Sequence, residues 1–209
     1  MRMVRKTNYV TERRLKMLKI TGTAIFPHLN TPNTKFNPDG VYEVSVRIDA
    51  KQMTELMANI KPYMEDEFKT LCAINKIDYS KKTKVSEDTP WRKATAKDGT
   101  IIENQWDIKI KQNRLCGSGE KQWKFTPKLF NSRNEICSDV IGSGSRINVA
   151  FKPYCWYVKG QLGISLRLVA VQVIKLESYD ACPFDPIEED TPLVGEEFEK
   201  KLRDAMDNA

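Results

Sequence analysis

Two long runs of alternating apolar residues, joined by a short polar corner, lie between Val140 and Ser178. In the first run, Ile147, Val149 and Phe151 are separated from one another by polar or small residues. Successive side chains of a β-strand point to opposite faces, so this spacing predicts strands with one apolar face and one exposed face. The Lys-Gly-Gln corner predicts that the two strands pair as a hairpin, around which the rest of the chain is organised.

The other face of the first strand is basic and aromatic, because it carries Arg146, Lys152, Tyr154 and Trp156. Cations contact phosphates and flat rings stack on bases, so this face has the composition that a single-stranded nucleic acid requires. Pro153 lies within the run and removes a donor from the strand ladder. If it introduces a bulge, the later residues turn to the opposite face.

The net charge of +6 is distributed unevenly along the chain. Residues 182–209 hold nine acidic and three basic residues, which leaves +12 for residues 1–181. A basic body favours a polyanion as ligand, and the alternative explanation is an ordinary soluble surface. Residues 1–14 are predicted to form a basic arm whose cations are available to phosphates.

Further alternating runs predict strands on both sides of one helix, at Lys16–Phe26, Tyr42–Ile48, Trp106–Leu115 and Lys121–Phe130. Asp49 is placed to cap the helix, and apolar residues then keep helical spacing from Met53 to Ile74. Pro62 lies inside this spacing and predicts either a kink or two shorter helices. Residues 75–104 are polar and predict a long loop excursion.

The outward positions of these strands collect more cations, namely Lys109, Lys111 and Lys124, with Arg114 just beyond Lys111. A single lysine usually belongs to a solvated strand face. The joint pattern with Tyr154 and Trp156 is what indicates a nucleic-acid interface.

Two further tryptophans have alternative interpretations. Trp91 and Arg92 lie in the polar excursion, where the ring either stacks on a base or packs against the edge of the fold. Trp123 and Phe125 share the side of Leu129 and are predicted to be core residues rather than a stacking platform.

The sequence carries no recognised catalytic signature. One histidine and five cysteines without a CxxC pair give a zinc site few ligands, and they favour reduced thiols. Neither Gly-Ser turn has the spacing of a phosphate-binding loop or of a nucleophile elbow. Asp107, Asp139 and Glu103 match no metal-nuclease signature, so a nuclease is a minor alternative. We therefore expect a binding protein, not an enzyme, with no cofactor and no metal.

No apolar run approaches the length of a membrane helix, and the basic N-terminus lacks the apolar region of a secretory signal. We therefore expect no contact with a membrane.

The stretch GSGSRINVAF, followed by Pro153, Tyr154 and Trp156 in a Pro-Tyr-Cys-Trp element, resembles the phage single-stranded DNA-binding proteins of the short-tailed coliphage replication type. The stretch GVYEVSV resembles their early strand, and the likeness covers residues 40–48 and 105–178. The resemblance implies an OB fold and a role in phage DNA replication, recombination and repair in the cytoplasm of the infected bacterial host.

We therefore predict an all-β OB fold, a Greek-key barrel of about five strands. The domain is expected to span residues 15–181, with a helical and loop insertion over residues 50–104. By the resemblance, the acidic tail at residues 182–209 competes with DNA for the basic face and contacts polymerase or helicase. This tail is shorter than those of the family, mixed in charge and without a terminal aromatic residue. A homodimer is a further expected assembly.

The predicted function is sequence-independent binding of single-stranded DNA, with bases stacked on Tyr154 and Trp156. The residues predicted to contact phosphates are Lys109, Lys111, Arg114, Lys124, Arg146 and Lys152, with Trp91 and Arg92 as secondary candidates. The alternatives are an RNA-binding OB module and a phage structural or assembly protein whose basic face binds an acidic partner.

Overall fold

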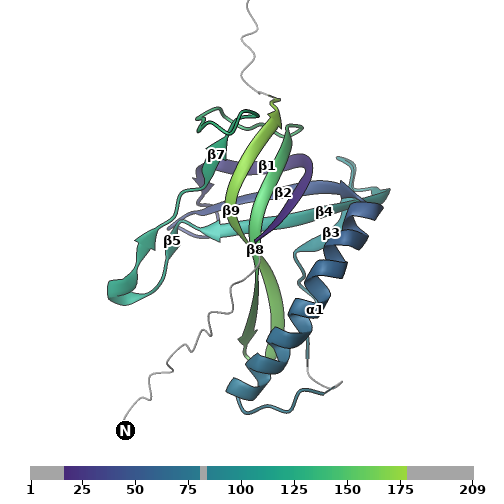
Figure 1. Ribbon diagram of the computed structural model, residues 1–209, viewed down its shortest axis with the longest axis vertical. Helices are drawn as coiled ribbons and strands as arrows, with labels where there is room; N and C mark the ends of the chain where they lie inside the picture. The colour runs from purple at the N-terminus through teal and green to yellow at the C-terminus, as the bar shows by residue number, and fades with distance from the viewer. Residues whose placement is uncertain (1–16, 81–83, 178–209) are drawn as a thin grey trace, which may run out of the picture. The chain divides into compact units, whose positions relative to one another are not determined.

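The computed structural model describes residues 17–80 and 84–177 and shows a β-barrel with one long helix (Figure 1). The strands are β1 (Leu18–Asn33), β2 (Val41–Asp49), β3 (Trp91–Thr95), β4 (Ile101–Asn113), β5 (Leu115–Cys116), β6 (Trp123–Lys124), β7 (Lys128–Phe130), β8 (Arg146–Val158) and β9 (Gln161–Lys175). The helix α1 (Ala50–Ile74) lies between β2 and β3, and a short 3-10 turn, η1 (Gly119–Lys121), lies between β5 and β6.

Five of these strands form a closed ring in the order β1, β2, β4, β9, β8 and back to β1. Four of the five pairings are antiparallel. The fifth is a parallel bridge between Lys111 of β4 and Arg167 of β9, and it closes the ring. A five-stranded Greek-key barrel of this kind is the OB fold, so the predicted fold class is confirmed.

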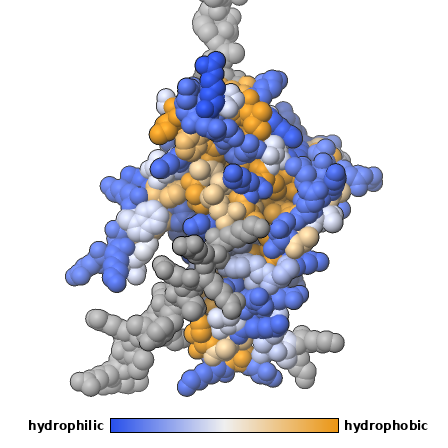
Figure 2. Space-filling view, viewed as in Figure 1, coloured by the Kyte–Doolittle hydropathy of each residue, from blue (hydrophilic) through white to orange (hydrophobic). Residues whose placement is uncertain are grey.

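The core lies inside the barrel, where the apolar residues of each alternating run meet. Val44 and Val46 of β2, Ile108 of β4, and Ile147 and Val149 of β8 are fully buried or nearly so. The face of the barrel seen in Figure 2 carries both hydrophilic and hydrophobic residues. The period-2 pattern therefore identified the inward face of the strands correctly, because apolar burial determines which face turns inward.

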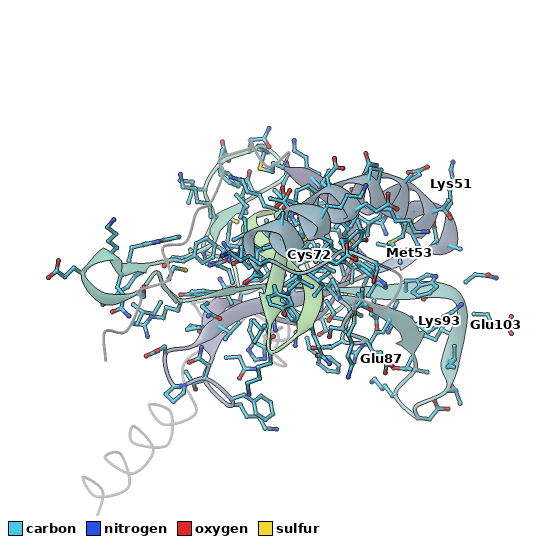
Figure 3. All side chains as sticks on the ribbon, turned by 90° about the horizontal axis from the view of Figure 1, so that it is seen from below. Lys51, Met53, Cys72, Glu87, Lys93 and Glu103 are labelled. Carbon is cyan, nitrogen blue, oxygen red and sulfur yellow. The ribbon has the colours of Figure 1, made fainter. Side chains whose placement is uncertain are left out.

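Helix α1 begins at the predicted capping box. The Asp49 carboxylate accepts a hydrogen bond from the Gln52 backbone N–H at 2.8 Å, and the Gln52 side chain accepts one from the Asp49 N–H at 3.4 Å. Met53 and Cys72, labelled near the two ends of the helix in Figure 3, are buried and belong to the core. The helix continues through Pro62, so the prediction of two shorter helices is wrong. Pro62 lies on the exposed side.

Several element boundaries differ from prediction. Strand β1 extends beyond Phe26 to Asn33, with irregular pairing to β2. The expected single strand at Lys121–Phe130 is two short strands, β6 and β7, separated by a loop that contains Pro127. The polar excursion at residues 75–104 contains β3, which pairs with β4 at the edge of the sheet. Hydrogen bonding to a neighbouring strand determined each of these boundaries.

The predicted domain at residues 15–181 encloses the barrel, whereas the predicted arm at 1–14 and tail at 182–209 lie outside the described residues. Four cysteines, Cys72, Cys116, Cys137 and Cys155, are free thiols in the described part of the chain. Within those same residues, no helix is long and apolar enough to cross a membrane.

The capping box generates a stability prediction. We expect Asp49→Ala to lower the free energy of unfolding by about 1 kcal/mol, because the Gln52 backbone N–H at the start of α1 loses the carboxylate that accepts its hydrogen bond. Asp66→Ala removes a carboxylate from an exposed position inside the same helix and is the matched control. Denaturant unfolding of both variants measures the difference, and equal stabilities would show that the cap contributes nothing.

Candidate nucleic-acid interface

Strand β8 keeps one outward face through Pro153. Pro153 is buried and opposes Leu166 of β9. The extra residue of the nearby bulge lies in β9, because Ala150 pairs with Ala170 while the next residue of β8 pairs with Leu168. The parity of β8 is therefore unbroken, and Lys152, Tyr154 and Trp156 stay on the outward face. The alternative that Pro153 turns the aromatic residues inward is wrong.

Outward side chains of three strands meet along one shallow groove, which we call the β4–β8–β9 groove. The groove has a volume of about 110 Å³ and is lined by Asp88, Thr89, Pro90, Lys109, Lys111, Trp156, Ile164, Ser165 and Leu166. The parallel bridge places Lys111 opposite Arg167, and Arg167 in turn pairs with Lys152 across β8 and β9. Barrel closure therefore places cations from both ends of the domain sequence beside Tyr154 and Trp156.

Arg167 is a site residue that the sequence analysis missed. Its guanidinium carbon lies 3.3 Å from the centre of the Tyr154 ring, which is a cation–π contact. A stacked guanidinium keeps its N–H donors in the plane of the group, where they remain available to phosphate oxygens. The signal was present in the run Leu162–Leu168, because Arg167 is the single cation at an outward position of that alternating strand.

Trp156 lies directly on the backbone of β9. An added Cβ at Gly163, its partner across the hairpin, would be 2.1 Å from Cζ2 of the Trp156 ring. Only glycine leaves the space that the ring occupies. Because the strand supports one side of the indole, the ring is fixed in place while remaining partly exposed in the groove.

Among the described residues, Lys109 is the one cation lining the groove that pairs with a carboxylate, since its Nζ lies 2.9 Å from Oε2 of Glu43 on β2. Asn33 also donates a hydrogen bond to Glu43, at 2.9 Å. Burial by itself raises the pKa of Glu43, but the hydrogen bonds from Lys109 and Asn33 and the charge of Lys109 outweigh it and lower that pKa. Glu43 is therefore a fixed anion beside the groove.

Three of the other predicted cations lie away from the groove. Arg146 is six residues from Lys152 along β8, roughly 20 Å at the rise of a strand, and it lies opposite Lys175 near the far end of β9. Lys124 lies on β6, and Arg114 lies between β4 and β5. Their predicted contacts with DNA would have to be made outside the groove.

Trp91 and Arg92 belong to β3. Trp91 lies opposite Ile108, whose side chain points into the barrel, and it packs against the core. This placement favours the alternative that Trp91 packs on the barrel edge. Arg92 is exposed beside it. The prediction for Trp123 is wrong, because this ring is 54% exposed on β6.

Residues 17–80 and 84–177 contain no group of three or more His, Cys, Asp or Glu side chains arranged to hold a metal ion.

The sequence matches no protein-family model and no curated protein. Among solved structures, the chain is similar to gp2.5, a single-stranded DNA-binding protein encoded by bacteriophage T7, with a TM-score of 0.60 and 18% identity over 82% of this chain and 98% of that one. It is also similar to the single-stranded DNA-binding protein from bacteriophage Enc34 in complex with ssDNA, with a TM-score of 0.50 and 13% identity over 78% and 88% of the two chains. The predicted resemblance to these phage proteins is confirmed for the fold.

The close approach of Trp156 to Gly163 can be tested by substitution. We expect Gly163→Ala to displace the indole, to lower the free energy of unfolding by about 1–3 kcal/mol, and to change the tryptophan fluorescence of the folded protein. Ser165→Ala, at the next outward position of β9, adds no atom and serves as the control. Unaltered fluorescence and stability in Gly163→Ala would contradict the described position of the ring.

Glu43 generates a prediction about pH. Because folding lowers its pKa, ionised Glu43 stabilises the folded state above its ordinary pKa of 4.5, and this contribution is lost as the pH falls through the lower folded value. We expect Glu43→Gln to be less stable than the wild type at neutral pH, and the difference to shrink in acid. Denaturant unfolding across this pH range measures it. Glu65→Gln, on the exposed side of α1, makes the same substitution away from Lys109 and Asn33 and is the control.

Proposed function

We propose that this chain binds single-stranded DNA without sequence preference in the β4–β8–β9 groove. The observation that carries the proposal is the convergence of partly exposed Tyr154 and Trp156 with the outward cations of three strands. Bases would stack on the two aromatic residues, and phosphates would contact Lys109, Lys111, Lys152 and Arg167. The solved structures with the same fold include a phage protein in complex with ssDNA, and this supports the proposal.

The chemistry of the groove favours a single strand over a duplex. A base reaches the ring of Tyr154 or Trp156 only when it is unpaired, because pairing holds its faces within the stack of the duplex. Stacking contributes about 1–3 kcal/mol per base and tolerates any sequence, since every base has a π-face. The phosphate contacts likewise carry no sequence information.

The wider role that we propose is in phage DNA replication, recombination and repair in the cytoplasm of the infected host. It is supported by the phage origin of the proteins that share the fold and by the Pro-Tyr-Cys-Trp element at residues 153–156. The proposed contacts with polymerase or helicase depend on residues 182–209, which lie outside the described residues. A homodimer remains a separate prediction.

Titration with an oligonucleotide of dT and with a matched duplex tests the function. We expect dT to quench the tryptophan fluorescence and the duplex to bind much more weakly. The logarithm of the affinity should fall with the logarithm of salt concentration with a slope of about −3, which corresponds to about four phosphate contacts on a single strand. Equal binding of the duplex, without quenching, would instead indicate a general polyanion surface.

Substitutions then assign the contacts. We expect Trp156→Ala and Tyr154→Ala each to weaken dT binding by about 1–3 kcal/mol, and Lys152→Ala to reduce the salt slope by about 0.7. Lys69→Ala, an exposed lysine of α1, is the control and should leave both quantities unchanged. Competition with RNA of the same length separates the alternatives, because an RNA-binding module would prefer the RNA.

A further inference from the structure

The β5–β6 hairpin, residues 115–124, projects from the barrel at the end of β4 (Figure 1). It carries Trp123, whose side chain is 54% exposed, together with the exposed cations Lys121 and Lys124. Glu120 is its single acidic residue. In Figure 2 the tip of this projection is blue and white, so the exposed ring stands in polar surroundings rather than in an apolar patch.

Two successive ring contacts connect Trp123 to the core of the barrel. The Trp123 and Phe125 ring centres are 6.2 Å apart with an angle of 73° between the planes, and Phe125 and Tyr42 are 6.1 Å apart at 71°. Tyr42 is buried in the barrel. These edge-on contacts connect the indole to the core without stacking over it, so the ring is held while more than half of it stays open to a ligand.

The hairpin continues the path of the groove. Strand β4 carries Lys109 and Lys111 in the groove and leads through Arg114 directly into β5, where Leu115 pairs with Lys124. Lys111 and Leu115 are four residues apart, about 13 Å along a strand. A polyanion that leaves the groove beside Lys111 therefore meets the cations of the hairpin next.

We propose that the β5–β6 hairpin is a second nucleotide-binding element for the same strand of DNA. Trp123 stacks on a base, and Arg114, Lys121 and Lys124 contact the adjacent phosphates. The proposal rests on the proposed function, since it assigns the hairpin to the DNA that occupies the groove. Charge favours DNA over a protein partner as the ligand, because the hairpin that carries the exposed ring also carries the exposed Lys121 and Lys124 and only one acidic residue.

Binding of dT oligonucleotides of two lengths distinguishes contacts made by the hairpin from contacts made by the groove. A short dT of about four nucleotides matches the smallest sites known for one OB fold, and a long dT of about 16 matches the largest. We expect Trp123→Ala to weaken binding of the long dT by about fivefold or more and to leave the short dT unaffected. Trp123→Phe, which keeps a stacking ring, should recover most of the loss. Trp156→Ala should weaken binding of both lengths.

Ile136→Ala removes another exposed apolar side chain, 78% exposed, from outside the hairpin and is the control for surface truncation. Thermal unfolding of each variant checks that the barrel is intact. Unchanged binding of the long dT to Trp123→Ala, with both lengths still bound by the wild type, would overturn the hairpin proposal and leave the proposed function standing. An equal loss for both lengths would also overturn it, because the hairpin would then act through the groove. Failure of the wild type to bind either length would overturn both.

Discussion

The parallel bridge between Lys111 of β4 and Arg167 of β9 is the constraint on which the candidate interface depends. The other four pairings of the barrel are antiparallel, whereas this one joins two strands that run in the same direction and closes the ring. Without closure, β4 would lie towards one edge of an open sheet and β9 towards the other. The cations of β4 would then be separated from Tyr154 and Trp156.

Closure also has an electrostatic cost, because it places Lys111, Arg167 and Lys152 beside one another across three strands. Two contacts offset part of this repulsion. The Tyr154 ring lies under the guanidinium of Arg167, and the Glu43 carboxylate pairs with Lys109. Both leave cationic groups facing solvent. A phosphate chain would reduce the remaining repulsion, which is the electrostatic basis of the proposed binding of DNA.

Local rules accounted for the elements whose stabilising contacts are close in sequence. The capping box at Asp49 and Gln52 involves residues three positions apart, and the alternation of β8 is a property of the strand backbone. Predictions failed where distant contacts decided the outcome. Trp123 was assigned to the core from its parity, but its strand is a two-residue piece of a projecting hairpin. Arg167 went unnoticed because its importance comes from β4 and from Tyr154, which the alternation of its own strand does not reveal.

The sequence by itself determined which side chains of each strand turn outward, because the period of 2 and the burial of apolar residues are local properties. It thereby identified Lys109, Lys111, Lys152, Tyr154 and Trp156 as members of exposed faces. Only the tertiary structure decided which of these faces meet. Strand register, the bulge in β9 and ring closure select the neighbours. Ring closure in particular depends on the pairing of Lys111 with Arg167, which are more than 50 positions apart in the chain.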